Sequence, residues 1–345
     1  MKALIATLFA GAIAFAGGAA PASAADEYPR LNLRLAHAFP SGWVQTKVDQ
    51  WWADEIERRS DGRIKINILW AGSGGAPLEI LKLVGSGAVD MGAVPPAYFT
   101  NELPLTGAPN ALPLTFTSNA EALKVMNGLV ENVPAIQEEL KANNVWPLWF
   151  NTLNTYQPLC TKPIDSVDDW QGLRIRTFGA YQPALWESLG AVGVNVLPAE
   201  IYEGLQKGRL DCAFYSTDLY ASTKMYEVAK YLTTLGFGPQ PTWPMWVNYE
   251  KWQSWPDNVK QLIEEVSAEA AQMSVDALAE ANEASLKTMV DNGVQVVEFT
   301  EMDKLMDTVP DFKALWLSEM EKIGKGDEAR SVLEYWNAND DDPNS

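Results

Sequence analysis

The stretch EILKLVGSGAVDMG at residues 79–92 recurs as EIYEGLQKGRLDCA at residues 200–213, and this repeat indicates the fold. Glu, Ile, Gly and Asp fall at the same offsets in the two copies. Each copy has the pattern of an amphipathic helix, a glycine stop and a short apolar strand. The repeat favours two similar α/β lobes with a ligand cleft between them. The alternative is chance recurrence of a common helix–strand connection.

Residues 1–24 have the pattern of a secretory signal peptide. Lys2 precedes a short apolar stretch at residues 3–16, and Ala22-Ser23-Ala24 matches a small-residue cleavage site. The apolar stretch is short for a membrane-spanning helix, so a retained anchor is the less favoured alternative. We therefore expect an exported protein whose mature chain is not inserted directly into a membrane.

The charge balance argues against two classes of partner. The chain has 45 Asp and Glu against 26 Lys and Arg, with a formal net charge of −19. Binding to nucleic acid or to anionic lipid draws its affinity from a basic surface, so neither is expected. The acidic residues are spread along the sequence, which is typical of a solvated surface.

Cys160 and Cys212 are the two cysteines of the chain. In an exported protein an even number favours a disulfide, and each cysteine lies in a strand-like stretch. Two buried free thiols remain the alternative. The spacing does not fit a zinc site, and no metal is expected.

The hydrophobic pattern predicts most of the remaining elements. Strands at 31–36 and 64–70 flank a helix at 44–60, which together make a βαβ unit. Further predictions are a helix at 119–140, an irregular Gly-, Pro- and Trp-rich segment at 237–246, and a very long helix from Ser254 to about 291. At 1.5 Å per residue the long helix would span roughly 50 Å and could bridge two lobes.

No catalytic motif is present in the sequence. His37 is the single histidine, and the chain lacks the HExxH, GxSxG and P-loop patterns. Binding is therefore favoured over catalysis, with a secreted enzyme on a similar two-lobed fold as the alternative. His37 follows the first strand, where it could touch a ligand or serve as a structural histidine.

Arg176 is the candidate for holding an anion. It alternates with Arg174 on a predicted strand, so the two side chains point in opposite directions. The guanidinium group suits a carboxylate because it can donate two parallel hydrogen bonds. The pattern alone leaves open whether Arg176 lies in the cleft or on the surface.

Three motifs together resemble a known family. DWQGLRIRT at 169–177 is similar to the D-L-K-G-L-K-I-R signature of TRAP-transporter solute-binding proteins of the DctP type. PAEIYEGLQKGRLD at 198–211 looks like the P-x-E-x-Y-x-A-L-Q-x-G-x-x-D pattern of that family, and SGAVDMG at 86–92 looks like its first-lobe motif. The resemblance implies a periplasmic protein that closes around a small organic acid and delivers it to a membrane transporter driven by an ion gradient.

The resemblance also implies the architecture. It predicts an α/β, two-lobed periplasmic binding protein of the type II-like class, with hinge strands and a long helix that crosses both lobes. The expected division is a signal peptide at 1–24, a first lobe of 25–153 plus 243–281, and a second lobe of 154–242 plus 282–345. No cofactor is implied.

In the family the second basic residue of the signature clamps the ligand carboxylate, and that position is Arg176 here. Phe214 and Tyr215 stand where many members have Glu and Asn, and Tyr156-Gln157 stand where sialic-acid binders place another Arg. These departures favour a monocarboxylate with an apolar or aromatic body over sialic acid. The predicted ligand-binding residues are Arg176, Tyr156, Phe178, Tyr215, Tyr98, Trp243, Trp246 and His37.

Overall fold

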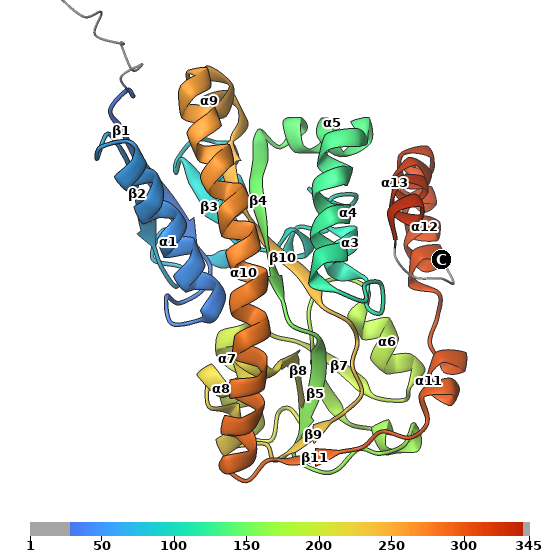
Figure 1. Cartoon of the computed structure of the whole chain (residues 1–345). Helices are drawn as coiled ribbons and strands as arrows, with labels where there is room; N and C mark the ends of the chain where they lie inside the picture. Colours follow the sequence, from blue (N-terminus) through green and yellow to red (C-terminus); the bar gives the residue numbers. More distant parts are fainter. Residues whose placement is uncertain (1–27, 341–345) are drawn as a thin grey trace, which may run out of the picture.

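The chain folds into two α/β lobes, each built on its own sheet (Figure 1). The computed structural model describes residues 28–340, and the predicted signal peptide lies outside the described residues. The first sheet has the order β2-β1-β3-β10-β4. Its strands are β1 (Leu31–His37), β2 (Ile64–Leu69), β3 (Met91–Ala93), β4 (Val145–Leu153) and β10 (Gln240–Asn248). The predicted two-lobed fold is confirmed.

The second sheet has the order β11-β9-β5-β8-β6-β7. Its strands are β5 (Tyr156–Cys160), β6 (Arg174–Thr177), β7 (Val192–Asn195), β8 (Cys212–Ser216), β9 (Tyr231–Thr233) and β11 (Gln295–Val297). In each sheet a central strand, β1 or β6, lies between two parallel neighbours, and the next strand outward is antiparallel. The two lobes therefore share one strand arrangement.

The sequence repeat forms the same joint in both lobes. It comprises helix α2 (Ile80–Gly85) before β3, and helix α7 (Pro198–Gln206) before β8. Gly87 and Gly208 have φ of 74° and 64°, a left-handed conformation that other residues rarely adopt. The carboxylates of Asp90 and Asp211 each accept a hydrogen bond from a backbone N–H of the central strand, at 2.8 Å and 2.9 Å. The repeated Asp thus fastens the helix–strand connection to the neighbouring strand.

Strand β10 occupies the segment that we predicted to be irregular, and that prediction is wrong. All nine of its residues are buried, and it pairs with β3 on one side and β4 on the other. Pro241 and Pro244 cannot donate ladder hydrogen bonds. The register with β4 shifts on both sides of Pro244, which accommodates the two prolines within an interior strand. The predicted helix at 119–140 is likewise two helices, broken before Pro134.

Helices cover both sheets. In the first half of the chain they are α1 (Val44–Arg59), α3 (Ala108–Ala111), α4 (Asn119–Asn132) and α5 (Pro134–Ala142). In the second half they are α6 (Gln182–Ser188), α8 (Thr217–Ser222), α9 (Tyr249–Ser254), α10 (Asp257–Asp291), α11 (Met302–Thr308), α12 (Phe312–Lys322) and α13 (Gly326–Asn339).

Helix α10 crosses both lobes, as predicted (Figure 1). It is 35 residues long and packs on α1 and β4 of the first lobe and on α8 of the second. It begins at Asp257 and not at Ser254, which ends the preceding α9. Ser267 accepts a hydrogen bond from the indole of Trp52 at 3.0 Å, and the carbonyl of Leu278 accepts one from Asn154 at 3.1 Å. The helix is therefore attached to the first lobe and to the hinge region.

The C-terminal helices depart from the expected division. Helix α11 lies in the second lobe, but α12 and α13 return to the first, where α13 packs on α4 and α5 (Figure 1). Trp336 stacks on Phe116 with ring centroids 5.3 Å apart, and the indole of Trp316 donates to the carbonyl of Pro104 at 3.1 Å. These buried tryptophans hold residues 312–339 against the first lobe, so the assignment of 282–345 to the second lobe is wrong for this part.

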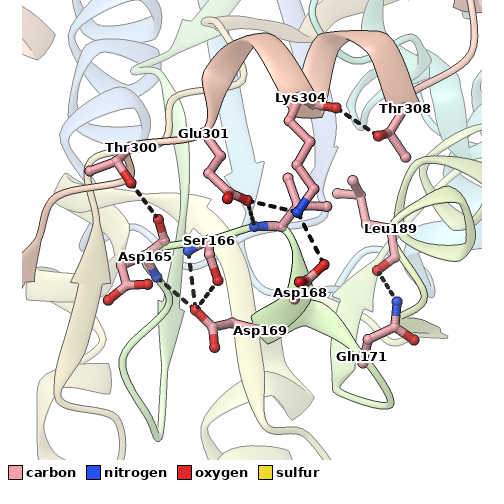
Figure 2. A network of polar contacts seen from close by, with 11 residues as sticks. Asp165, Ser166, Asp168, Asp169, Gln171, Leu189, Thr300, Glu301, Lys304 and Thr308 are labelled. Carbon is pink, nitrogen blue, oxygen red and sulfur yellow. Dashed lines mark hydrogen bonds and ion pairs between the residues drawn. The ribbon is translucent and has the colours of Figure 1, made fainter.

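Figure 2 shows how α11 is joined to the loop that leads into β6. The carboxylate of Glu301 accepts from the backbone N–H of Val167 at 2.8 Å and pairs with Lys304 at 3.1 Å. Lys304 also reaches Asp168 at 3.2 Å. The carboxylate of Asp169 accepts from the Ser166 hydroxyl at 2.8 Å and so closes the loop on itself. This network fixes the start of the signature segment.

Candidate functional site

Arg174 and Arg176 face opposite sides of β6, as their alternation predicts. Arg174 is exposed, and its guanidinium pairs with Asp211 at 2.8 Å outside the cleft. Arg176 is only 1% exposed, and its side chain lines a cavity between the two lobes. Burial of a side chain that always carries a charge has to be compensated by partners.

The partners of Arg176 are neutral. Its Nη1 donates to the carbonyl of Phe214 at 3.2 Å, and its Nε donates to the carbonyl of Val196 at 3.3 Å. The guanidinium carbon lies 4.7 Å from the ring centroid of Phe178 and 5.0 Å from that of Tyr215, both within cation–π range. Within residues 28–340, no acidic side chain forms an ion pair with Arg176. The guanidinium group is therefore buried with its charge uncompensated by a carboxylate of the described chain.

The cavity beside Arg176 has walls from both lobes and from the hinge strands. It is lined by Phe39, Pro95, Tyr98, Asn110, Leu153, Tyr156, Arg176, Phe178, Tyr215 and Thr242. Its volume in this conformation is about 10 Å³, room for roughly one water molecule. An organic acid is larger than this space, so a bound acid would require the lining side chains or the lobes to shift outward.

Three tyrosines surround the guanidinium group. Burial raises the pKa of Tyr98, Tyr156 and Tyr215, and the nearby Arg176 charge opposes this rise only in part. The hydroxyls therefore stay protonated at neutral pH and can donate hydrogen bonds to an anion. Tyr220 connects the two strands that carry Tyr156 and Tyr215. Its hydroxyl donates to the carbonyl of Gln157 at 2.6 Å and accepts from the N–H of Tyr215 at 2.8 Å.

The structure brings together five of the eight residues predicted for ligand binding. Arg176, Tyr98, Tyr156, Phe178 and Tyr215 line the cavity. Tyr98 comes from the turn after β3 in the first lobe, whereas Phe178 and Tyr215 come from the second. We retain these five as proposed ligand contacts.

The other three predicted residues lie outside the cavity lining. The indole of Trp246 donates to the carbonyl of Val94 at 2.9 Å inside the first lobe. Trp243 packs behind Phe39 with ring centroids 4.6 Å apart, and His37 lies deeper still at 0% exposure. Trp243, Trp246 and His37 support the first-lobe wall.

His37 and Trp243 belong to a buried polar cluster around Asp49. The carboxylate of Asp49 accepts from His37 Nε2 at 2.8 Å, from Asn151 at 2.6 Å and from the Trp243 indole at 3.1 Å. His37 Nδ1 in turn accepts from the N–H of Phe39 at 3.0 Å. All of these groups are satisfied within the fold, which gives His37 a structural role.

Sequence reasoning missed five residues of the lining: Phe39, Pro95, Asn110, Leu153 and Thr242. Phe39 and Pro95 follow the C-terminal ends of β1 and β3, where ligands collect in open α/β sheets, so their position was a usable signal. Thr242 lay in the segment predicted to be irregular. Asn110 gave no signal, because its place depends on how α3 packs.

The two cysteines are joined by a disulfide. Cys160 on β5 and Cys212 on β8 are directly paired across the antiparallel ladder of the second sheet. The bridge thus ties the strand that enters from the hinge to the strand that carries Phe214 and Tyr215. It lies within the second lobe and does not connect the two lobes.

Residues 28–340 contain no group of three or more His, Cys, Asp and Glu side chains placed to hold a metal ion. In the same range, no helix combines the length and the apolar character needed to cross a membrane.

The family is shown by comparison with known proteins. The profile of the DctP family, described as bacterial extracellular solute-binding protein, family 7, matches residues 35–318. This match spans most of the chain, and the protein belongs to that family. The resemblance to TRAP-transporter solute-binding proteins is thereby confirmed.

Relatives with assigned ligands are distant. The 2,3-diketo-L-gulonate-binding periplasmic protein YiaO of Escherichia coli is 24% identical over 254 residues, which cover 73% of this chain and 75% of that protein. The monocarboxylate 2-oxoacid-binding periplasmic protein all3028 of Nostoc sp. is 24% identical over 280 residues, which cover 79% and 75%.

Solved structures share the fold. A marine metagenome TRAP solute-binding protein in complex with co-purified pyroglutamate matches with a TM-score of 0.79 at 18% identity, covering 90% of this chain and 100% of that one. A TRAP periplasmic solute-binding protein from Chromohalobacter salexigens with bound D-glucuronate matches with a TM-score of 0.78 at 20% identity, covering 89% and 100%. At these identities the structural similarity establishes the two-lobed fold. It does not identify the ligand, which has to be inferred from the residues of the site.

Proposed function

We propose that this protein captures a small monocarboxylate between its lobes, with Arg176 as the partner of the carboxylate. The observation that carries the proposal is the burial of Arg176 at 1% exposure, with carbonyls and aromatic faces as its partners. An unpaired buried charge costs several kcal/mol, and a carboxylate that accepts two parallel hydrogen bonds would offset this cost. Tyr98 and Tyr156 would supply further hydrogen bonds.

The rest of the cavity favours an apolar or aromatic body on the ligand. Much of its lining is hydrocarbon, contributed by Phe39, Pro95, Leu153 and Phe178. The amide of Asn110 is already engaged, since its oxygen accepts from the N–H of Ala97 and its nitrogen donates to the carbonyl of Pro241. A sugar acid would need partners for several hydroxyl groups, and leaving them buried without hydrogen bonds is costly. A monocarboxylate with few other polar groups fits better.

We infer that the bound acid is delivered to a TRAP-type membrane permease from the periplasm. The family membership and the N-terminal pattern of residues 1–24 support this inference. The rival hypothesis, a secreted enzyme, is disfavoured because the family consists of solute-binding proteins and the cavity presents no paired acid and base.

The test is a thermal-shift screen of the mature chain with three sets of acids: straight-chain and 2-oxo monocarboxylates, uronates, and pyroglutamate. A ligand raises the melting temperature in proportion to RT ln(1 + [L]/Kd). We expect monocarboxylates to stabilise the wild type and to leave Arg176→Ala unchanged. Stabilisation by uronates alone would contradict the monocarboxylate assignment. Chemical conversion of the acid, detected by NMR, would favour the enzyme hypothesis.

A further inference from the structure

A second, larger hollow lies directly outside the cavity that contains Arg176. It is an open space of about 450 Å³ between the lobes, bordered by Leu78 of the first lobe and by Val196 and Glu200 of the second. Tyr98 and Phe178 are the two residues that line both the inner cavity and this outer hollow. They form the partition between the two spaces.

The partition is built from one ring of each lobe. Tyr98 ends the short turn Pro96–Tyr98 of the first lobe, and Phe178 follows β6 of the second. Their ring centroids lie 6.3 Å apart in an edge-to-face arrangement, a favourable aromatic contact. Beside them the two lobes approach each other closely, since even an added Cβ on Gly179 would lie only 3.7 Å from the carbonyl oxygen of Ala97. The ring pair therefore lies between the inner cavity and the outer hollow.

The guanidinium group lies immediately behind this partition. Its carbon is 4.7 Å from the Phe178 ring, and its Nε donates to the carbonyl of Val196, a residue that lines the outer hollow. A carboxylate held by Arg176 would therefore direct its body along the inner face of the two rings. A chain that outgrows the inner cavity would meet Tyr98 and Phe178 first.

We propose that Tyr98 and Phe178 form a gate that sets the maximum length of the ligand. The inner cavity has to widen even for a short acid, but a longer chain would in addition hold the two rings apart, so the lobes would close fully only on short acids. Removal of one ring would join the inner cavity to the outer hollow and admit longer chains. This inference rests on the proposed function, because it takes the carboxylate to be at Arg176. The outer hollow also contains the Glu200 side chain, so the longer ligands admitted should be monocarboxylates and not dicarboxylates.

The experiment is calorimetry with straight-chain monocarboxylates of three to ten carbons on the mature chain. The wild type should bind more tightly with each added carbon up to a cut-off, beyond which affinity falls at least tenfold. Phe178→Ala and Tyr98→Ala should move the cut-off to longer acids, with affinity still rising about fourfold for each added methylene. The readout is the position of the cut-off and not the absolute affinity, because Phe178→Ala also removes a contact to Arg176.

Two control variants should keep the wild-type cut-off. Tyr98→Phe retains the ring without its hydroxyl, and Leu78→Ala changes the outer hollow at a side chain that is 59% exposed and outside the gate. Thermal melting shows that each variant is folded. An unchanged cut-off in both alanine variants, or a wild type without any cut-off up to ten carbons, would overturn the gate and leave the proposed function standing. Failure of every acid to bind the wild type and all variants would overturn the proposed function and the gate together.

Discussion

A hydrogen bond between the lobes should stabilise the closed conformation. The amide nitrogen of Gln45, at the start of α1, donates to a carboxylate oxygen of Asp218 on α8 at 2.9 Å. The other oxygen of Asp218 accepts from Asn154 in the hinge region at 3.2 Å. Gln45 and Asp218 are 0% and 3% exposed, so the pair is desolvated when the lobes are closed. Opening would return both groups to water.

The expected effect follows from this burial. A hydrogen bond to a charged group contributes about 1.5–3 kcal/mol, and a buried donor left without a partner costs a similar amount. Asp218→Ala should therefore weaken binding of the identified acid by about 10- to 100-fold, through loss of closure. Gln45→Ala should act in the same direction but more weakly, because Asp218 keeps its bond from Asn154.

The assay is a double-mutant cycle measured by calorimetry, with X-ray scattering to follow closure. If the bond links closure to binding, the double variant should lose about 1 kcal/mol less than the sum of the single variants. Gln50→Ala, on the same helix but bonded to Asp54, is the matched control and should bind normally. Losses that add within about 0.5 kcal/mol, together with unchanged scattering, would show that this hydrogen bond does not link closure to binding.

Three further predictions concern the scaffold and the pH dependence. Ala270→Pro, in the buried interior of α10, should cost about 3 kcal/mol or more and weaken closure, and an unchanged melting temperature and affinity would contradict the bridging role. The double variant Cys160→Ser, Cys212→Ser should lose roughly 4 kcal/mol of unfolding free energy in denaturant titration without reductant, and equal stability would count against this. Affinity should be constant from pH 6 to 9, because arginine keeps its charge throughout this range. Burial raises the pKa of Tyr98 and Tyr156, so neither hydroxyl ionises in the same range. A titration midpoint of the affinity between pH 6 and 9, measured by calorimetry, would contradict the proposed site.

The elements that the sequence predicts well are those set by local pattern. The βαβ unit, the repeated helix–strand joint and the course of α10 follow from periodicity and glycine stops, which act over a few residues. Strand β10 escaped prediction because Pro241 and Pro244 argue against an interior strand. The bulges that make room for them depend on pairing with β4, which is distant in sequence. The return of α12 and α13 to the first lobe likewise depends on long-range packing of tryptophans.

Some residues of the candidate site are likewise predictable from local sequence pattern, and others are not. Alternation along β6 was sufficient to separate the surface Arg174 from the buried Arg176, because side-chain direction is a local property of a strand. The aromatic residues were harder to place. The sequence does not distinguish Trp243 and Trp246 from aromatic residues that pack on a ligand. In the structure, each donates its indole N–H to a partner inside the first lobe. Which aromatic ring reaches the cavity is decided by how the two lobes face each other.

Arg176 is the proposed partner of the ligand carboxylate, and calorimetry of its variants tests this role. With the acid identified by thermal shift, Arg176→Ala should bind about 10²- to 10³-fold more weakly, because the ligand carboxylate would be buried without its partner. Arg176→Lys should also bind poorly, since it keeps the charge and loses the two-pronged geometry. Arg174→Ala, on the exposed side of the same strand, should bind almost normally. Loss of binding in Arg174→Ala with retained affinity in Arg176→Ala would show that Arg176 does not hold the ligand carboxylate.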